Sequence, residues 1–61
     1  MENKEYLLSF FVIDNNGNEI DSNIISIEAL DERDARTKSM IFLQKRYKGN
    51  RLEIESITLA E

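Results

Sequence analysis

The sequence predicts an α+β fold, with a β-hairpin, one helix and a third strand in a single ββαβ domain over residues 1–61. Two observations predict the hairpin: an apolar run of strand length at residues 6–13, and the turn-forming pair Asn16-Gly17 that follows it. The third is a segment after Asp31 in which apolar residues recur at helical spacing. A chain of this length lies near the lower size limit for a hydrophobic core, so one small domain is expected.

The first strand is expected over residues 5–13, and it is apolar on both faces. Side chains alternate between the two faces of a strand. One face therefore carries Tyr6, Leu8, Phe10 and Val12, and the other carries Leu7, Phe11 and Ile13. A single helix covers only one face of a sheet. The second face therefore needs a partner, either a second copy of the chain or another protein.

The hairpin turn is expected at residues 14–18, and the second strand then runs through residues 19–29. If Asn16 and Gly17 are the two central turn residues, the opposed pairs are Leu8 with Ile25, Tyr6 with Ile27, Ile13 with Ile20, and Ser9 with Ile24. A three-residue turn with a bulge would instead shift this register by one residue and exchange the faces.

The helix is expected to begin after Asp31 and to end at Gly49. Asp31 is a favourable N-cap residue, and Asp34 stands where a capping box places its second acidic side chain. Between these ends, an apolar stripe is predicted to pack on the face of the sheet that carries Tyr6, Leu8 and Phe10. The stripe consists of Ala35, Ser39, Phe42 and Leu43, with Met40 and Tyr47 on its flank.

The third strand is expected over residues 51–59, and its apolar residues change parity along the strand. Leu52 and Ile54 are even-numbered, whereas Ile57 and Leu59 are odd-numbered, so a bulge near Glu55-Ser56 is needed to keep them on one face. A right-handed crossover through the helix carries this strand to the far side of the first strand. The predicted sheet is therefore antiparallel throughout, in the order second, first, third strand, with the helix on one face.

Charge and composition exclude several classes of function. Residues 1–32 carry a net charge of −7, residues 33–51 carry +6, and residues 52–61 carry −3. The chain has no cysteine and no histidine, and it has no glycine-rich phosphate loop. We therefore expect a cytoplasmic, non-enzymatic protein with no catalytic residues, no cofactor, no small-molecule substrate and no membrane segment.

A metal site is also not expected, although residues 14–18 resemble the start of a calcium loop. Asp14, Asn16 and Asn18 stand at alternate positions. However, Glu19 occupies the sixth place of the loop, where glycine is needed, and Ile25 occupies the twelfth, where a glutamate is needed. An ordinary hairpin turn is the better interpretation.

Two surfaces are candidates for binding a macromolecule. The first is the second face of the sheet, predicted to dock a protein, and its residues are Leu7, Phe11, Ile13, Ile20 and Ile24. The simplest partner is a second copy of the chain, in a homodimer joined by stacking of the two sheets or by pairing of an open edge strand. The alternative is a nucleic-acid-binding regulator that contacts phosphates with the basic end of the helix. The residues of this basic cluster are Lys45, Arg46, Lys48 and Arg51, with Tyr47 among them.

The chain also resembles the small ββαβ proteins encoded by phages and mobile elements of low-GC bacteria. The likeness covers the whole chain and rests on Lys-Glu-Tyr at the start of the first strand, the Asn-Gly hairpin, Asp-Ala-Arg-Thr-Lys-Ser in the helix, and Arg-Leu-Glu-Ile-Glu-Ser-Ile in the last strand. The resemblance implies an accessory protein that inhibits or regulates a host protein by binding it. It implies no functional residue.

Overall fold

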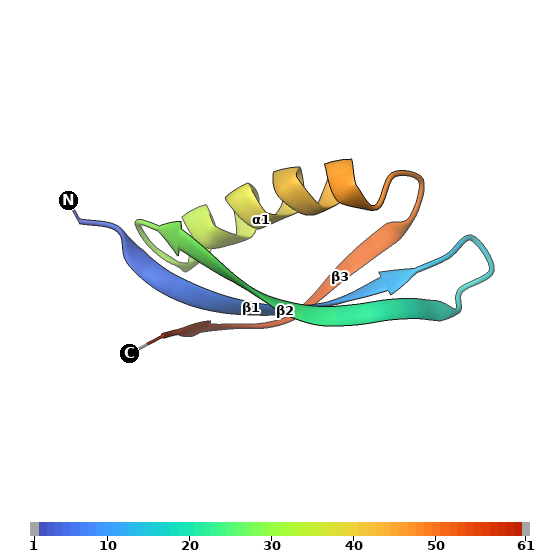
Figure 1. The fold of residues 1–61 in the computed structure, drawn as a ribbon, viewed down its shortest axis with the longest axis horizontal. Helices are drawn as coiled ribbons and strands as arrows, with labels where there is room; N and C mark the ends of the chain where they lie inside the picture. Colours follow the sequence, from blue (N-terminus) through green and yellow to red (C-terminus); the bar gives the residue numbers. More distant parts are fainter. Residues whose placement is uncertain (1, 61) are drawn as a thin grey trace.

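The computed structural model describes residues 2–60 and contains three strands and one helix. The strands β1 (Lys4–Ile13), β2 (Glu19–Ala29) and β3 (Arg51–Leu59) form one antiparallel sheet in the order β2-β1-β3. The helix α1 (Glu32–Arg46) lies across one face of this sheet, as Figure 1 shows. The predicted ββαβ fold, its strand order and its single helix layer are therefore confirmed.

The pairing of β1 with β2 follows the predicted register over most of its length. Leu8 lies opposite Ile25, Tyr6 opposite Ile27, and Ser9 opposite Ile24. The pairing fails at the end nearest the turn, where Ile13 lies opposite Glu19. The predicted pair of Ile13 with Ile20 is therefore wrong, because Ile20 occupies a bulge.

The turn itself explains this bulge. The N–H of Asp14 donates to the carbonyl of Asn18 and the N–H of Gly17 donates to the carbonyl of Asp14, which leaves three residues in the loop. Gly17 has a φ of 85°, whereas no residue other than glycine has a positive φ among residues 2–60. A two-residue turn with positive φ at Asn16 is thus excluded. The longer turn shifts the register by one residue, and the bulge at Ile20 shifts it back.

The loop also gives the side chain of Asp14 a structural role. The backbone N–H groups of Asn16 and Asn18 each donate to Oδ1 of Asp14 at 2.9 Å. The side chain of Asp14 therefore stabilises the turn by bonding to the following backbone.

The pairing of β1 with β3 contains the predicted bulge. Ser9 lies opposite Ser56, whereas Phe10 lies opposite Ile54, so Glu55 is the extra residue. The bulge brings Leu52 and Ile54 onto the same face as Ile57 despite their different parity.

The hydrophobic core lies between the sheet and α1. Its buried apolar residues come mainly from the central strand, which is sandwiched between two neighbours, and they are Tyr6, Leu8, Phe10, Val12, Ala29, Ala35 and Leu43. Ser39 is the buried polar residue that accompanies them. From the helix, the core thus takes the row Ala35, Ser39 and Leu43, whose members are four residues apart and face the sheet.

Phe42 departs from the predicted stripe, because its side chain remains 50% exposed. Two of the three buried helix residues, Ala35 and Ser39, are small, so the helix backbone lies close to the sheet. A phenylalanine beside this row is therefore displaced to the flank of the helix, toward β2.

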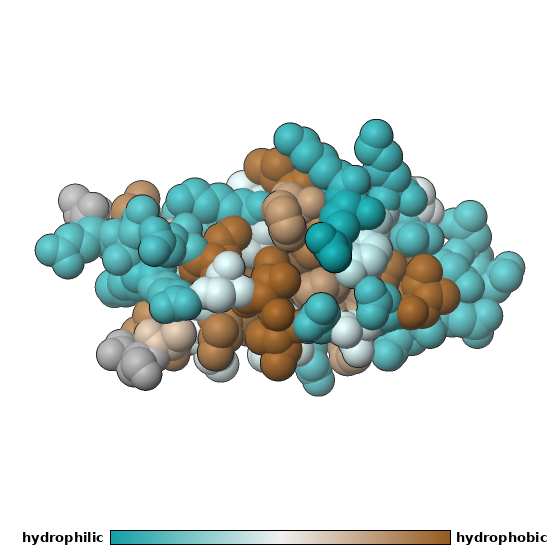
Figure 2. Space-filling model, viewed as in Figure 1, coloured by the Kyte–Doolittle hydropathy of each residue, from teal (hydrophilic) through white to brown (hydrophobic). Residues whose placement is uncertain are grey.

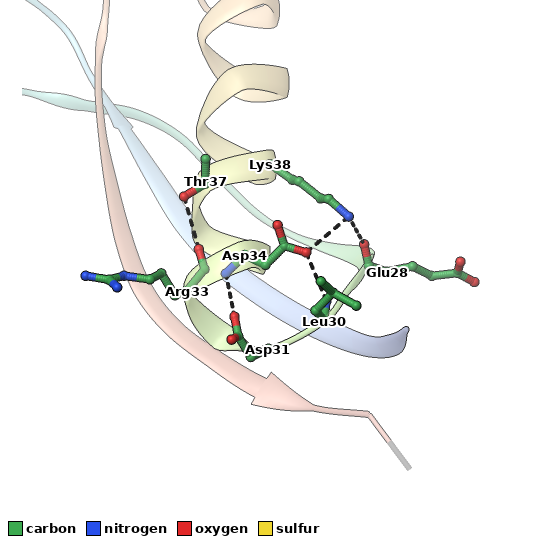
Figure 3. A network of polar contacts seen from close by, with 7 residues as sticks. All are labelled: Glu28, Leu30, Asp31, Arg33, Asp34, Thr37 and Lys38. Atoms are coloured by element: carbon green, nitrogen blue, oxygen red, sulfur yellow. Dashed lines mark hydrogen bonds and ion pairs between the residues drawn. The ribbon is translucent and has the colours of Figure 1, made fainter. Parts of the chain in front are cut away.

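The start of α1 is fixed by a polar network, shown in Figure 3. Oδ1 of Asp31 accepts a hydrogen bond from the N–H of Asp34 at 2.8 Å, which confirms Asp31 as the N-cap. The carboxylate of Asp34 reaches back to the N–H of Leu30 at 2.9 Å and pairs with Nζ of Lys38 at 3.2 Å. Two backbone donors at the helix start are thereby satisfied.

The other end of the helix comes earlier than predicted. The last helical residue is Arg46, and Tyr47 is the C-cap, with its N–H donating to the carbonyl of Leu43 at 2.8 Å. Gly49 instead lies in the following turn, where its φ of 83° turns the chain toward β3.

Candidate protein-binding surfaces

The face of the sheet opposite α1 is not covered by another element within residues 2–60. The helix lies entirely on the other side of the sheet (Figure 1). Leu7 and Phe11 lie two positions on either side of Ser9 in β1, and Ile24 lies opposite Ser9 in β2. These three side chains therefore form one apolar patch, which we call the open sheet face.

The open sheet face keeps its apolar side chains in contact with solvent. Leu7 is 40% exposed and Ile24 is 61% exposed, whereas Phe11 is half-buried. Ile13 lies two residues beyond Phe11 and is also half-buried. The structure thus brings together four of the five residues predicted for partner binding. Ile20 stands in the bulge near the turn, so it has no cross-strand partner in β1 that would assign it to this face.

A polar rim surrounds the open sheet face and is mostly acidic. The hydroxyl of Ser9 donates to Oε1 of Glu55 at 2.9 Å, and the hydroxyl of Ser26 donates to Oε2 of Glu5. Glu28 lies opposite Glu5, and Glu53 lies opposite Phe11. The rim therefore holds four carboxylates.

Two cations lie near this rim: Nη2 of Arg51 is 3.4 Å from Oε2 of Glu53, and Nζ of Lys38 is 3.3 Å from the carbonyl oxygen of Glu28. Two cations do not neutralise four carboxylates. The open sheet face is thus an apolar patch inside a field of negative potential.

A second apolar surface lies on the flank of the molecule, between β2 and α1. Ile25, Ser26, Ile27 and Phe42 line a groove of about 420 Å³, which we call the β2 groove. Figure 2 shows apolar side chains gathered across the middle of this flank. Sequence reasoning missed this groove because it placed Phe42 in the core. The signal that could have found it is the pair of small residues, Ala35 and Ser39, which brings the helix too close to the sheet for Phe42 to fit beneath it.

The basic cluster at the end of α1 is exposed, but its aromatic residue is engaged elsewhere. Tyr47 is half-buried, its ring centroid lies 5.9 Å from that of Phe10, and its hydroxyl donates to Oδ2 of Asp21 at 2.9 Å. The guanidinium of Arg46 lies 5.9 Å from the centroid of the Tyr47 ring. The cations of this cluster are all exposed, whereas Tyr47 packs against the core, and the cluster consists of Lys45, Arg46, Lys48 and Arg51.

Two other kinds of site are absent from the part of the chain that the structure describes. No group of three or more acidic, cysteine or histidine side chains in residues 2–60 is arranged to hold a metal ion. In the same residues, α1 is too short and too polar to cross a lipid bilayer. No family model, no curated protein and no solved structure matches this chain.

Proposed function

We propose that this chain is a non-enzymatic protein-binding module that docks another protein on its open sheet face. The observation that carries this proposal is the cluster of Leu7, Phe11 and Ile24, three neighbouring apolar side chains that no element covers within residues 2–60. Burying apolar surface of this kind contributes about 25 cal/mol per Å² to association. A module without chemistry of its own acts by occluding its partner or by bringing it to another molecule.

The acidic rim indicates the chemistry of the partner. Four carboxylates around an apolar patch attract a segment whose own apolar surface is bordered by lysine or arginine. The serine bonds to Glu5 and Glu55 hold two of these carboxylates in place beside the patch. A basic amphipathic helix meets both requirements, because it presents an apolar stripe between rows of cations. In keeping with the lack of cysteine, we place this interaction in the cytoplasm.

The test uses two synthetic amphipathic helices as probes, one with leucine and lysine faces and one with leucine and glutamate faces. Fluorescence anisotropy should show binding of the lysine peptide alone, weakened by added salt. Ile24→Asn should lower the affinity at least tenfold, as expected for the loss of about 1.4 kcal/mol of contact energy. Ile41→Asn is the matched control, because Ile41 is a similarly exposed isoleucine on the helix, at 54%.

Two results would refute the proposal. The first is that the lysine peptide binds Ile24→Asn as tightly as it binds Ile41→Asn. The peptide would then be attracted by charge alone and not by the open sheet face. The other is the absence of binding at low salt.

Nucleic-acid binding by the basic cluster is the second candidate, favoured by its four exposed cations. It has less support, because Tyr47 packs on Phe10 and donates its hydroxyl to Asp21 instead of projecting toward a base, and because Arg51 already has a carboxylate neighbour in Glu53. Titration of random single-stranded DNA across a salt series tests it. Binding with a steep salt dependence that is lost in Lys45→Gln would favour this candidate over protein docking.

A further inference from the structure

The exposed edge of β2 offers backbone hydrogen-bonding groups at a definite place. The N–H of Ala60 donates to the carbonyl of Glu5 at 2.9 Å, so the odd-numbered residues of β1 direct their backbone groups toward β3. The even-numbered residues of β1 therefore face β2, and Leu8 lies opposite Ile25. By the alternation of an antiparallel ladder, the even-numbered residues of β2 direct their N–H and C=O groups outward.

Side chains of the protein already occupy several of these outward groups. Oδ1 of Asp21 accepts from the N–H of Ser22 at 2.9 Å, and Oδ1 of Asn23 accepts from the N–H of Ile24 at 2.8 Å. At the other end of the strand, Nζ of Lys38 donates to the carbonyl of Glu28 at 3.3 Å. Such contacts protect an edge strand against indiscriminate pairing.

Between these protected positions, the edge of β2 is open at Ser26. Within residues 2–60, no side chain bonds to the backbone N–H or C=O of Ser26, and its outward direction follows from the alternation above. Ser26 also lines the β2 groove, together with Ile25, Ile27 and Phe42. The open backbone and the apolar groove therefore lie side by side, as required for the addition of a strand.

We propose that the occupant is a second copy of this chain, paired antiparallel along β2 with the two Ser26 residues opposite each other at a two-fold axis. This interface does not depend on the open sheet face. In this register Ile25 lies beside Ile27 of the other copy, and Ile27 beside Ile25, so each β2 groove meets an identical groove. The two sheets then form one continuous sheet of six strands.

The helices of the two copies support the same arrangement through their charges. The first turn of α1 carries Glu32 and Asp34, whereas its last turn carries Lys45 and Arg46. A two-fold axis beside β2 sets the two helices antiparallel, so the acidic start of each helix lies alongside the basic end of the other. The helix dipoles are then also opposed in direction, which is favourable.

The spacing of the helices gives Phe42 a role. The two β1 strands would lie three strand spacings apart, or about 14 Å. This exceeds the usual distance of about 8–10 Å between packed helix axes, so large side chains are needed to fill the gap. The side chain of Phe42 is half exposed and lies on the flank of α1 that would face the gap between the two helices. The other edge of the sheet suits pairing less, because β3 is shorter and is interrupted by the bulge at Glu55.

The experiment exploits the absence of cysteine from the natural sequence. In Ser26→Cys, two cysteines at the axis would have Cα atoms about 5.5 Å apart, within the range that a disulfide accepts. Mild oxidation of Ser26→Cys should give a covalent dimer in high yield. Ser56→Cys, which places the same substitution at an exposed position of β3, should stay largely monomeric.

Sedimentation supplies an independent measurement. The wild-type chain should be mostly dimeric at about 100 μM, a concentration at which a dimer of micromolar affinity is largely formed. Phe42→Glu should be a monomer with an unchanged circular dichroism spectrum, whereas Leu7→Asn, on the central strand, should remain a dimer. A monomeric wild type, or cross-linking of Ser56→Cys rather than Ser26→Cys, would overturn the proposal. A dimer that is lost in Leu7→Asn and kept in Phe42→Glu would overturn it as well, by placing self-association on the open sheet face.

Discussion

Ser39 is a polar residue at a position where the packing requires a small side chain. It is fully buried under the sheet, and its hydroxyl has no hydrogen-bond partner within residues 2–60. An unpaired buried hydroxyl is destabilising, and serine is also a poorer helix former than alanine. The small size of the Ser39 side chain therefore suits the packing of α1 on the sheet, whereas its unpaired hydroxyl lowers the stability of the fold.

Ser39→Ala should accordingly stabilise the protein. We expect a gain of about 1 kcal/mol in the free energy of unfolding, because the methyl group fits the same space without an unpaired polar atom. Urea denaturation followed by circular dichroism measures this change. Thr37→Ala is the control, since the hydroxyl of Thr37 is exposed and donates to the carbonyl of Arg33 at 3.1 Å. A destabilised Ser39→Ala would mean that the hydroxyl makes a bond essential to the core.

Asp34 connects the helix start to the pH dependence of stability. The hydrogen bond from the N–H of Leu30 and, after it, the contacts with Lys38 lower the pKa of the Asp34 carboxyl below its ordinary 3.8. A lowered pKa in the folded state stabilises the fold at pH values above 3.8, and this contribution is lost as the pH falls through the folded-state pKa.

Asp34→Asn should therefore be less stable than the wild type at pH 7, with a difference that shrinks toward zero near pH 2. Urea midpoints of both proteins, measured across this range, test the expectation. Glu32→Gln removes a charge from the same helical turn, where no bond of the Glu32 side chain is present among residues 2–60, and should show a smaller difference at pH 7. A difference for Asp34→Asn that stays constant with pH would contradict this account.

At the scale of elements, the attachment of α1 depends on one large side chain. Of the three buried helix residues, only Leu43 is large, and it joins the cluster of Leu8, Phe10 and Val12. Ala35 and Ser39 bury little side-chain area, but their small size lets the helix lie close to the sheet. The helix is thus anchored strongly near its C-terminal end.

Leu43→Ala should cost about 2–5 kcal/mol of stability, the usual loss for a leucine removed from a core. A domain of this size has only about 3–5 kcal/mol available from its core, so the variant should be largely unfolded at 37 °C. Phe42→Ala, one residue earlier, should change the unfolding free energy by less than about 1 kcal/mol in dilute solution, because its side chain is half exposed. Equal losses in the two variants would contradict the packing described for α1.

The hairpin shows how two local irregularities can compensate each other. The three-residue loop shifts the pairing of β1 and β2 by one residue, and the bulge at Ile20 restores it before the strands reach the core. Leu8 and Ile25 therefore still share the face that α1 covers. The hydrophobic pattern of the strands decides the register of the long pairing, and the turn adapts to it.

At the scale of the whole molecule, the sheet is longer than the helix that packs on it. A helix of 15 residues is about 22 Å long, whereas the molecule extends over 41 Å. In Figure 1 the β1-β2 hairpin extends well beyond the end of α1. A sheet that its single helix leaves partly uncovered would gain stability from the association that we propose.

The proposed dimer makes this gain measurable. Each tenfold increase in protein concentration should raise the apparent stability by about 1.4 kcal/mol per dimer, because unfolding is then coupled to dissociation. Urea midpoints of the wild type should increase with protein concentration between about 1 and 100 μM. The urea midpoint of Phe42→Glu should be the same at every concentration in this range. A wild-type midpoint that is independent of concentration would show that folding and association are not coupled.

The sequence by itself determined the elements, the strand order and four of the five residues expected on the second face of the sheet. Each of these depends on a local pattern: the alternation of residues 6–13, the cap at Asp31, and the change of parity near Glu55. Only the tertiary structure decided the turn geometry, the end of α1 at Arg46 and the exposure of Phe42. These depend on how closely the helix approaches the sheet and on how two strands of fixed register are joined. Periodicity assigns a residue to a face, but the distance between packed layers decides whether its side chain fits beneath.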